Sequence, residues 1–243
     1  MRPIRLMGPV MLAAMLPAAV TAQDLSEARV KELVREAIRE NPAIVMDAVQ
    51  LLEQRQQVAE QAQAQTVLRD RRDLLERDPN APVLGNPDGD VTVVEFFDYN
   101  CPYCRRVMPE VQALLEEDPN VRLVYREWPI LGDGSVFAAR AALAARKQGK
   151  YEEFHWAMMG MNGRAEEDSV LRIAREVGLD IDRMRADMQA PEVDMHIETS
   201  MELTRALGFQ GTTSFVIGHA LVPGLVEKDV LADQVDRARS EAD

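Results

Sequence analysis

The sequence predicts one α/β domain that contains a helical insertion and follows an N-terminal α-helical extension. Three observations lead to this fold class. A strand–helix–strand pattern spans residues 91–125, helical character dominates from about 135 to 207, and strand character returns from Thr213 to Ile217. A β-helix-β unit of this length implies a parallel strand pair with a right-handed crossover. Because strands lie on both sides of the helical stretch, we expect a single domain over residues 83–243.

The first 22 residues have the layout of a secretory signal peptide. Arg2 and Arg5 form a charged start, an apolar run extends from Leu6 to Ala19, and small residues ending at Ala22 form a cleavage pattern. We expect cleavage after Ala22 and export to the periplasm, as a soluble protein in an oxidising compartment. No later stretch approaches the ~20 apolar residues that a membrane-spanning helix needs.

The chain is strongly acidic, with a formal net charge of -13 over 243 residues. An acidic surface disfavours nucleic acid and anionic lipid as partners. Two cysteines cannot form the framework of a disulfide-dense scaffold. Length and composition therefore allow one large domain or one domain with an extension, and the acidic charge disfavours nucleic-acid-binding proteins.

Residues 23–80 are expected to form a separate N-terminal helical segment. The dipeptide Asn41-Pro42 ends its first helix and begins a second one, with Asn41 as N-cap and Pro42 at the first helical position. The second helix is expected to reach about Arg77, before the break at Asp78–Pro82. Apolar residues at the spacing of an amphipathic helix mark the first helix. They are Val30, Leu33, Val34, Ala37 and Ile38.

Two interpretations of this helical segment are open. It can be an extension that packs on its own domain, or an oligomerisation element whose apolar stripe meets copies of itself. The middle of the second helix, QRQQVAEQAQAQ, has a thin apolar stripe and can bury little surface alone. We favour the oligomerisation element, and with it a homo-oligomer.

The first part of the α/β domain is defined by residue type. Val91–Phe97 is rich in β-branched and aromatic residues, as in a buried strand. A helix is expected from Pro102 to about Glu117, and a second strand at Val121–Tyr125. These elements make up the β-helix-β unit.

The helical insertion, at about residues 135–207, is expected to have several breaks. They fall around Gly160–Arg164, at Gly178 and at Ala190-Pro191. The remaining elements, in order, are a strand at Thr213–Ile217, a hairpin turn at Gly218-His219, a short strand at Ala220–Val222 and a closing helix at Glu227–Glu241.

The chain has two cysteines, Cys101 and Cys104, and they stand where the first strand leads into a helix. Pro102 suits the first turn of that helix, which places Cys101 at or near its N-cap. There, unpaired N–H groups and the positive end of the helix dipole lower the pKa of the thiol. Arg105 and Arg106 add positive charge nearby. Cys104 lies one turn further on, so the pair offers one nucleophilic thiolate and one resolving thiol.

The same C-x-x-C spacing also occurs in zinc sites and in structural disulfides. Tetrahedral zinc takes four ligands, and the candidates besides the cysteines, His155, His196 and His219, are scattered along the chain. A disulfide across two residues closes a very small loop and stabilises little. C-x-x-C at a strand-to-helix junction within a β-helix-β pattern is typical of thioredoxin-like redox proteins, and we favour that interpretation.

Glu95 is an acid within an otherwise apolar strand, VVEFF. We expect it to be buried beneath the cysteines, where desolvation raises its pKa. A carboxylate at that place can accept the proton of Cys104 when a mixed disulfide resolves. The alternative is a half-exposed strand residue that points to solvent.

The segments EFFDYNCPYC and GTTSFVIGHALVPG, with the helical insertion between them, resemble the DsbA-like family of exported thiol–disulfide oxidoreductases. With its N-terminal helices, the chain is most similar to the ScsC and Com1-like branch. The resemblance implies a thioredoxin fold with a helical-domain insertion and no organic cofactor. It also implies that Cys101 attacks, Cys104 resolves and Glu95 is the buried acid. In that branch N-terminal helices can hold several catalytic domains together, and some members isomerise disulfides.

The chain departs from the family pattern at Thr213, where the family has a cis proline across from the redox cysteines. In the family, the backbone of the preceding residue, here Thr212, pairs with bound substrate. A non-proline cis bond costs ~2.5–4 kcal/mol against ~0.5–1 kcal/mol for X–Pro. The bond is therefore either held cis by the fold or trans in a different loop, and we expect it to be cis. The expected substrate-contacting residues are Pro102, Tyr103, Thr212 and Thr213.

These patterns predict an exported, oligomeric thiol–disulfide oxidoreductase that exchanges disulfides with extracytoplasmic proteins and with a redox partner protein. The direction of exchange does not follow from the sequence. An alternative is a copper-binding or copper-tolerance protein in which reduced Cys101 and Cys104 hold Cu(I), since paired thiolates are soft ligands. A third possibility is a chaperone-like protein with a methionine-lined surface, although the spacing of Met184 and Met188 fits core packing better.

Overall fold

The structure, a computed structural model, describes residues 26–242. These residues divide into two compact units, with the boundary between Gln54 and Arg55. The expected signal peptide lies outside the described residues. Among the described helices, none is both long enough and apolar enough to cross a membrane.

The first unit contains helix α1 (Glu27–Glu40) and the beginning of α2 (Ala43–Asp70). The side chain of Ser26 accepts a hydrogen bond from the backbone N–H of Arg29, as an N-cap residue does. α2 begins at Ala43, one residue later than the sequence predicts. No residue of α1 is buried, and the predicted apolar stripe is exposed to solvent. Its members Val30, Leu33, Val34 and Ile38 are 38–53% exposed.

The second unit is built on a five-stranded sheet with the strand order β1-β3-β2-β4-β5. β2 and β3 are parallel, and the other neighbouring pairs are antiparallel. Helix α4 (Pro102–Glu117) connects β2 to β3, as the β-helix-β pattern predicts. The strands are β1 (Val83–Gly85), β2 (Val91–Phe97), β3 (Val121–Glu127), β4 (Ser214–Ile217) and β5 (Ala220–Pro223).

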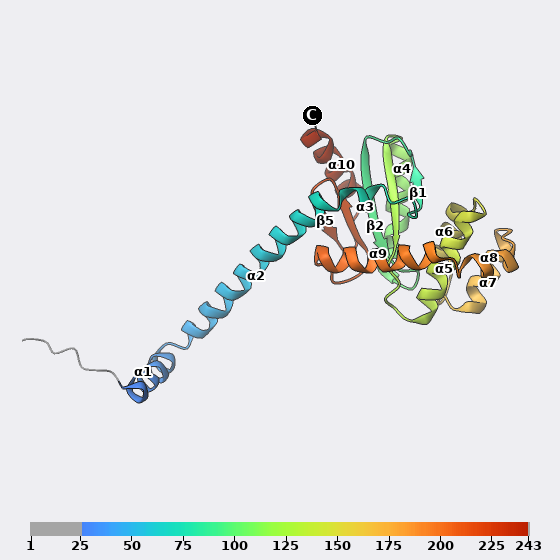
Figure 1. Ribbon diagram of the computed structural model, residues 1–243. Coiled ribbons are helices and arrows are strands. Elements are labelled where there is room, and N and C mark those ends of the chain that lie inside the picture. The colour runs from blue at the N-terminus through green and yellow to red at the C-terminus, as the bar shows by residue number, and fades with distance from the viewer. Residues whose placement is uncertain (1–25, 243) are drawn as a thin grey trace, which may run out of the picture. The chain divides into compact units, whose positions relative to one another are not determined.

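Helices cover both faces of the sheet (Figure 1). α4 and α10 (Lys228–Ala242) pack against the face that includes Val93 and Phe97 of β2. The other face carries α9 (Pro191–Leu207), α3 (Arg72–Glu76) and the C-terminal part of α2. Side chains alternate between the two faces along a strand, so Glu95 lies on the same face as Val93 and Phe97, toward α4.

The C-terminal part of α2 and all of α3 belong to the second unit. Leu68 and Leu75 are each 1% exposed and join the core beneath α9. Arg126 of β3 is fully buried and forms an ion pair with Asp78 at 2.6 Å. It also donates a hydrogen bond to the carbonyl oxygen of Leu74. Residues 55–78, which the sequence places in the N-terminal helical segment, therefore belong to the larger unit and contribute Ala64, Leu68 and Leu75 to its buried residues.

The helical insertion consists of α5 (Asp133–Lys147), α6 (Tyr151–Met159), α7 (Glu167–Glu176) and α8 (Ile181–Asp187), followed by α9. Buried alanines of α5 let the neighbouring helices approach closely. The predicted breaks around Gly160–Arg164, at Gly178 and at Ala190-Pro191 are confirmed. A further break at Gly149, where φ is +67°, was not predicted. β1 was also missed, because a three-residue strand gives almost no periodic signal.

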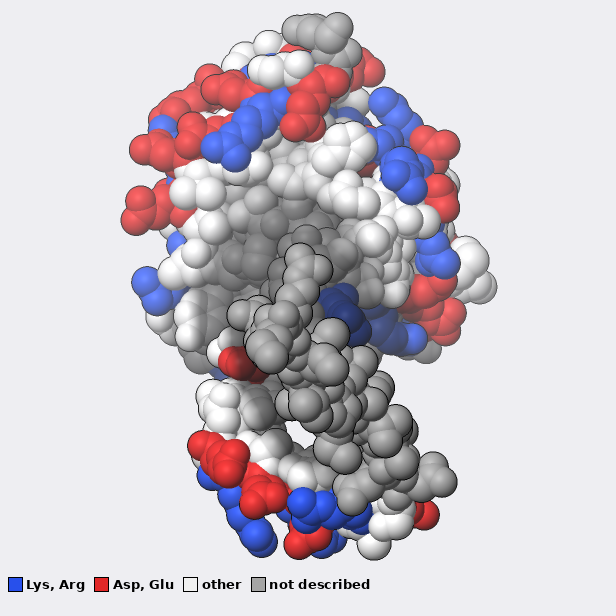
Figure 2. All heavy atoms as spheres, turned by 90° about the vertical axis from the view of Figure 1, so that its left-hand side faces the viewer, with Lys and Arg blue, Asp and Glu red and all other residues white. Residues whose placement is uncertain are grey.

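Charged side chains of both signs are mixed on the face shown in Figure 2. Elsewhere on the second unit, exposed charges form pairs, for example Arg172 with Glu176 at 2.9 Å and Arg185 with Glu167 at 2.6 Å. Such exposed pairs contribute little to stability. The net negative charge is therefore spread over this face rather than gathered in one patch.

Candidate functional site

Cys101 occupies the N-cap of α4, and Pro102 follows at the first position of that helix. The backbone N–H of Cys101 donates to the carbonyl oxygen of Asp98 at 3.0 Å, which closes the turn after β2. Its own carbonyl oxygen accepts the first helical hydrogen bond, from Arg105. A strand that stops at Phe97 and a proline that starts a helix together fix the thiol at the positive end of the helix dipole.

The two free thiols differ in acidity. The pKa of Cys101 is lowered to about 6, chiefly because the Cys104 thiol donates a hydrogen bond to it. The Thr212 side chain and the backbone N–H groups of Cys104 and Tyr103 add to this effect, and burial opposes it. Burial raises the pKa of Cys104 well above its ordinary value. The pair thus consists of one thiolate and one protonated thiol, as its position in the sequence predicts.

Glu95 is 2% exposed and lies beneath this pair, on β2. The pKa of its carboxyl is raised to about 8: burial is the largest cause, a hydrogen bond from Thr213 opposes it, and the Cys101 thiolate adds to it. The carboxyl also contributes to the raised pKa of Cys104. The predicted burial of Glu95 beneath the cysteines is confirmed.

The loop before β4, which contains Thr212 and Thr213, also lies at the site, although it is distant from Cys104 in the sequence. The peptide bond between Thr212 and Thr213 is cis, as predicted. Sγ of Cys101 lies 3.3 Å from the carbonyl oxygen of Thr212, to which it donates a hydrogen bond when the thiol is protonated. Thr213 is fully buried, and its hydroxyl donates to Oε1 of Glu95 at 2.9 Å. The fold therefore brings Cys101, Cys104, Glu95, Thr212 and Thr213 together.

An apolar groove of about 540 Å³ opens beside this loop and is lined in part by Thr212 and Thr213. Tyr103 forms part of its wall and is 53% exposed. Pro102 is exposed in the first turn of α4 but does not line the groove. The apolar lining comes from Tyr103, Leu207, Phe209, Leu221, Pro223 and Leu225.

Asp98 and Asn100 hold the cysteine loop in place, and the sequence analysis did not single them out. Oδ2 of Asp98 accepts hydrogen bonds from the backbone N–H groups of Ile130 and Leu131, at 2.8 and 3.0 Å. The Asn100 side chain donates to the carbonyl oxygen of Ala165 and accepts from its N–H group. Polar residues directly after a buried strand, in FFDYNC, were the signal that could have revealed both.

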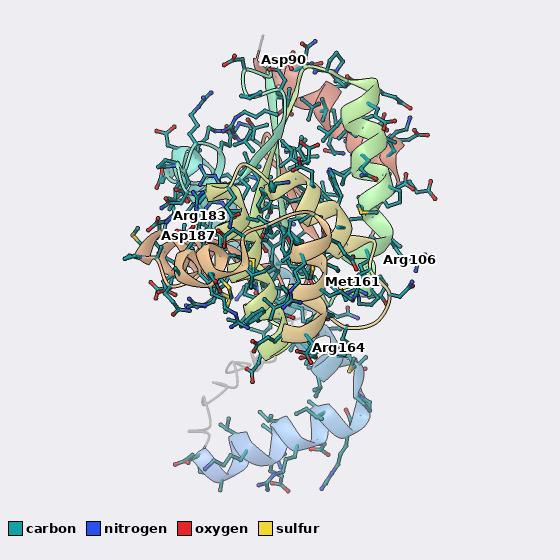
Figure 3. The ribbon with its side chains drawn as sticks, turned by 90° about the vertical axis from the view of Figure 1, so that its right-hand side faces the viewer. Asp90, Arg106, Met161, Arg164, Arg183 and Asp187 are labelled. Carbon is teal, nitrogen blue, oxygen red and sulfur yellow. The ribbon has the colours of Figure 1, made fainter. Side chains whose placement is uncertain are left out.

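Arg105 places positive charge near the two thiols, as predicted, since both interact with its guanidinium, and it has a structural role as well. Its Nη1 donates to the carbonyl oxygens of Met161 and Gly163, and its Nε donates to that of Tyr99. Figure 3 shows Met161 next to the end of α4 at which Arg106 lies. Arg105 therefore joins α4 to the loop after α6, while Arg106 remains exposed.

A second buried acid, Glu127, lies at the end of β3. It accepts a hydrogen bond from the hydroxyl of Tyr151 at 2.9 Å and a longer one from Tyr99 at 3.4 Å. Burial raises the pKa of Glu127 well above its ordinary value. Nδ1 of His155 lies 3.1 Å from the Tyr99 hydroxyl, and the histidine is 1% exposed, so it is buried and hydrogen-bonded. Within residues 26–242, no three His, Cys, Asp or Glu side chains form a group that could hold a metal ion.

Two family models match the chain. One is described as the DSBA-like thioredoxin domain and matches residues 92–236. The other is described as the Copper resistance protein ScsC N-terminal domain and matches residues 27–59. The first match covers more than half of the chain and includes the cysteine pair, Glu95 and the Thr212–Thr213 loop.

Solved structures agree with these matches. The chain is 72% identical to a thioredoxin-like oxidoreductase from Silicibacter pomeroyi DSS-3, over 70% of this chain and 98% of that one, with a TM-score of 0.69. It is 30% identical to the thiol-disulfide exchange protein alpha-DsbA2 from Wolbachia pipientis, over 74% and 97% of the two chains, with a TM-score of 0.68. It is 27% identical to a linker-deletion variant of Proteus mirabilis ScsC, over 95% and 100%, with a TM-score of 0.66.

Curated relatives place a similar domain in longer proteins. The chain is 31% identical over 137 residues to the Na(+)/H(+) antiporter NhaA 1 of Salinispora arenicola, which is 56% of this chain and 21% of that protein. It spans about a fifth of the length of the curated relatives that it matches first. The fold, the cysteine pair at the start of α4 and the matched family model together show that the chain belongs to the DSBA-like thioredoxin domain family.

Proposed function

We propose that this protein exchanges disulfides with extracytoplasmic proteins through Cys101. The observation that carries the proposal is the contrast between the two thiols, since the pKa of Cys101 is lowered to about 6 and that of Cys104 is raised. An attacking thiol is most effective when its pKa lies near the ambient pH. The pattern at residues 1–22 supports export, and the oxidising compartment that follows is one in which disulfides persist.

The exchange follows from the positions of three groups. The Cys101 thiolate attacks a substrate disulfide; a bond forms between Cys101 and one substrate sulfur, and the other substrate sulfur leaves as a thiolate. Cys104 then loses its proton to Glu95 and attacks Sγ of Cys101. The Cys101–Cys104 disulfide forms and the second substrate sulfur leaves as a thiolate, so the substrate is reduced. The reverse sequence oxidises a substrate dithiol.

The groove beside Thr212 and Thr213 suits an extended, apolar stretch of substrate next to the reacting sulfur. Its volume of about 540 Å³ and its largely apolar lining fit side chains of an unfolded or partly folded protein. The exposed ring of Tyr103 offers an aromatic contact close to the attacking cysteine. Protein thiols and disulfides are therefore better substrates for this site than small polar thiols.

Trapping of a covalent intermediate tests this function. A Cys104→Ala variant lacks the resolving thiol, so a mixed disulfide between Cys101 and a protein with scrambled disulfides should accumulate and be seen by non-reducing electrophoresis. Cys101→Ala is the control and should trap nothing. Absence of a Cys101-linked species, or an equal yield from both variants, would contradict the proposal. The activity that a substrate protein regains then distinguishes the two directions. Recovery from the scrambled substrate indicates isomerisation, and recovery from the fully reduced substrate indicates oxidation.

The first unit is the basis of an oligomer in this proposal. The stripe on α1 is apolar and exposed, and no residue of that helix is buried. An exposed apolar stripe at helical spacing is the surface that a helix buries against copies of itself. The match of residues 27–59 to the N-terminal domain of ScsC supports the same role.

Mass in solution tests the oligomer. A chain that begins at Arg55 keeps the core of the second unit and should have the mass of one subunit, whereas the full chain should have a multiple of it. Val34→Lys on the apolar stripe should lower the subunit count, and Glu36→Lys, on the opposite side of the helix, should leave it unchanged. An unchanged subunit count after removal of the first unit would show that this unit does not assemble the protein.

Copper binding by the two cysteines stays a prediction and is not proposed as a second function. Methionine thioethers are also soft ligands, but these methionines of the helical insertion belong to the hydrophobic core. Met158, Met159, Met184 and Met188 are at most 3% exposed.

A further inference from the structure

A hydrogen bond joins Glu95, the buried acid, to Thr213 in the loop before β4. The Thr213 hydroxyl donates to Oε1 of Glu95 at 2.9 Å, and the two residues lie 118 positions apart in the sequence. Thr213 is 0% exposed and Glu95 is 2% exposed. Among the described residues, this is the one hydrogen bond made to the Glu95 carboxyl. The neighbouring backbone is tied down as well, since the carbonyl oxygen of Thr213 accepts from the N–H of Gly224 at 2.8 Å.

We propose that the Thr213 hydroxyl is a positioning group that holds the Glu95 carboxyl beneath the cysteine pair and stabilises its ionised form. The inference deepens the proposed function and rests on it. A proline, which the family pattern has at this position, has no side-chain hydrogen-bond donor. Threonine supplies a hydroxyl donor. Burial of its side chain and the hydrogen bond to its carbonyl oxygen hold this residue in place.

The surroundings of Glu95 explain why one donor matters. The titratable groups that face it are the thiols of Cys101 and Cys104 on α4 and the hydroxyl of Tyr125 on β3, which is opposite Glu95 in the sheet register. β4 places Phe215 opposite Glu95 and contributes no charge. Burial and the Cys101 thiolate raise the pKa of the carboxyl, and the Thr213 hydroxyl is the group that lowers it.

The hydroxyl acts on the proton transfer that resolves a mixed disulfide. In that step the Cys104 thiol gives its proton to the Glu95 carboxylate, the new thiolate attacks Sγ of Cys101, and the substrate sulfur leaves. The step needs the ionised carboxylate. A hydrogen bond to a charged acceptor that is lost in a buried place shifts a pKa by about one to two units. Without the hydroxyl, the ionised fraction of Glu95 near pH 7 should fall roughly tenfold or more.

The test compares Thr213→Val, which keeps the shape and removes the hydroxyl, with Thr213→Ser, which keeps the hydroxyl. The carboxyl of Glu95 is titrated by NMR in the full chain labelled at the glutamate side-chain carboxyls, with Glu95→Gln to assign its resonance. The protein is measured in its disulfide form, where neither Cys101 nor Cys104 titrates. We expect the pKa of Glu95 to rise by about one to two units in the Val variant and to stay close to the wild-type value in the Ser variant.

An unchanged pKa in Thr213→Val, or an equal rise in both variants, would overturn the inference. If the Val variant does not fold, Thr213→Ala takes its place against the same Ser control. This titration needs no substrate, so its outcome is independent of whether the protein exchanges disulfides. The second measurement is the pH profile of mixed-disulfide resolution, which should move to higher pH in the Val variant and return in the Ser variant. A loss of rate at all pH values without a shift of the profile would indicate a purely structural role and contradict the inference.

Discussion

Replacing Cys104 by Ala tests the origin of the acidity of Cys101. The Cys104 thiol is the largest cause of the drop in the Cys101 pKa from 9.0 to about 6. A hydrogen bond to a charged acceptor contributes ~1.5–3 kcal/mol, and a thiol is a weak donor. The lower value, about 1.5 kcal/mol, corresponds to about one pKa unit. In Cys104→Ala we therefore expect a Cys101 pKa near ~7, and roughly 50% thiolate at about pH 7 instead of roughly 90%.

Cys104→Ser is the matched control, because its hydroxyl keeps a donor at the same place. The pKa of Cys101 should stay near the wild-type value or fall below it, since an O–H group is a stronger donor than a thiol. The assay is the ultraviolet absorbance of the thiolate against pH, with the rate of alkylation by iodoacetamide as a second reading. Each variant has one cysteine, so both signals belong to Cys101. No shift in the Ala variant, or equal shifts in both, would refute the reasoning and leave the helix N-terminus as the main cause.

Three further predictions concern the buried charges. Glu95→Gln should slow the resolution of mixed disulfides by roughly 10²-fold or more, the usual contribution of a positioned proton acceptor. The first attack by Cys101 should continue. Equal resolution rates for the variant and the wild type in stopped-flow measurements would argue against this role. The same substitution should stabilise the fold on the order of 3 kcal/mol at about pH 7. The pKa of Glu95 is raised from 4.5 to about 8 in the folded protein, so the wild type loses stability as the pH rises between these values. Urea unfolding at about pH 7 and about pH 4.5 checks this, and a variant less stable than the wild type at about pH 7 would contradict it. Asp78→Ala should lower the free energy of unfolding by ~3–5 kcal/mol, because it leaves Arg126 buried without its partner. Glu176→Ala, at an exposed pair, should lower it by less than ~1 kcal/mol. Similar urea midpoints for the two variants would show that the buried pair matters no more than the exposed one.

Much of the catalytic loop could be predicted because its signals are local. Five apolar residues around Glu95 indicate a buried strand, and a proline directly after Cys101 starts a helix. Burial of Glu95 and the N-cap position of Cys101 follow from these two patterns. The bond between Thr213 and Glu95 could not be predicted, because it depends on the register between β2 and β4, which no local pattern encodes.

The role of Arg105 and the packing of α2 show a second limit. A basic residue after a cysteine indicates positive charge near the thiol, but it does not indicate that Nε and Nη1 of Arg105 donate to three carbonyl oxygens. The polar sequence of α2 indicates an exposed helix, yet Ala64 and Leu68 are buried, and Leu68 joins the core on one face of the sheet. In both cases the partners are distant in the sequence, so the tertiary contacts decide and the local pattern does not.

The reduction potential of the Cys101–Cys104 couple tests most directly whether this protein works by disulfide exchange. Lowering the Cys101 pKa from 9.0 to about 6 stabilises the reduced form by ~1.4 kcal/mol at about pH 7, or about 30 mV. A pKa of about 6 lies between those of thioredoxin, ~7, and DsbA, ~3.5. We therefore expect a reversible two-electron titration in glutathione buffers, with a midpoint between about -270 and about -120 mV. If no disulfide formed between the two cysteines across that range, the proposed exchange mechanism would be wrong.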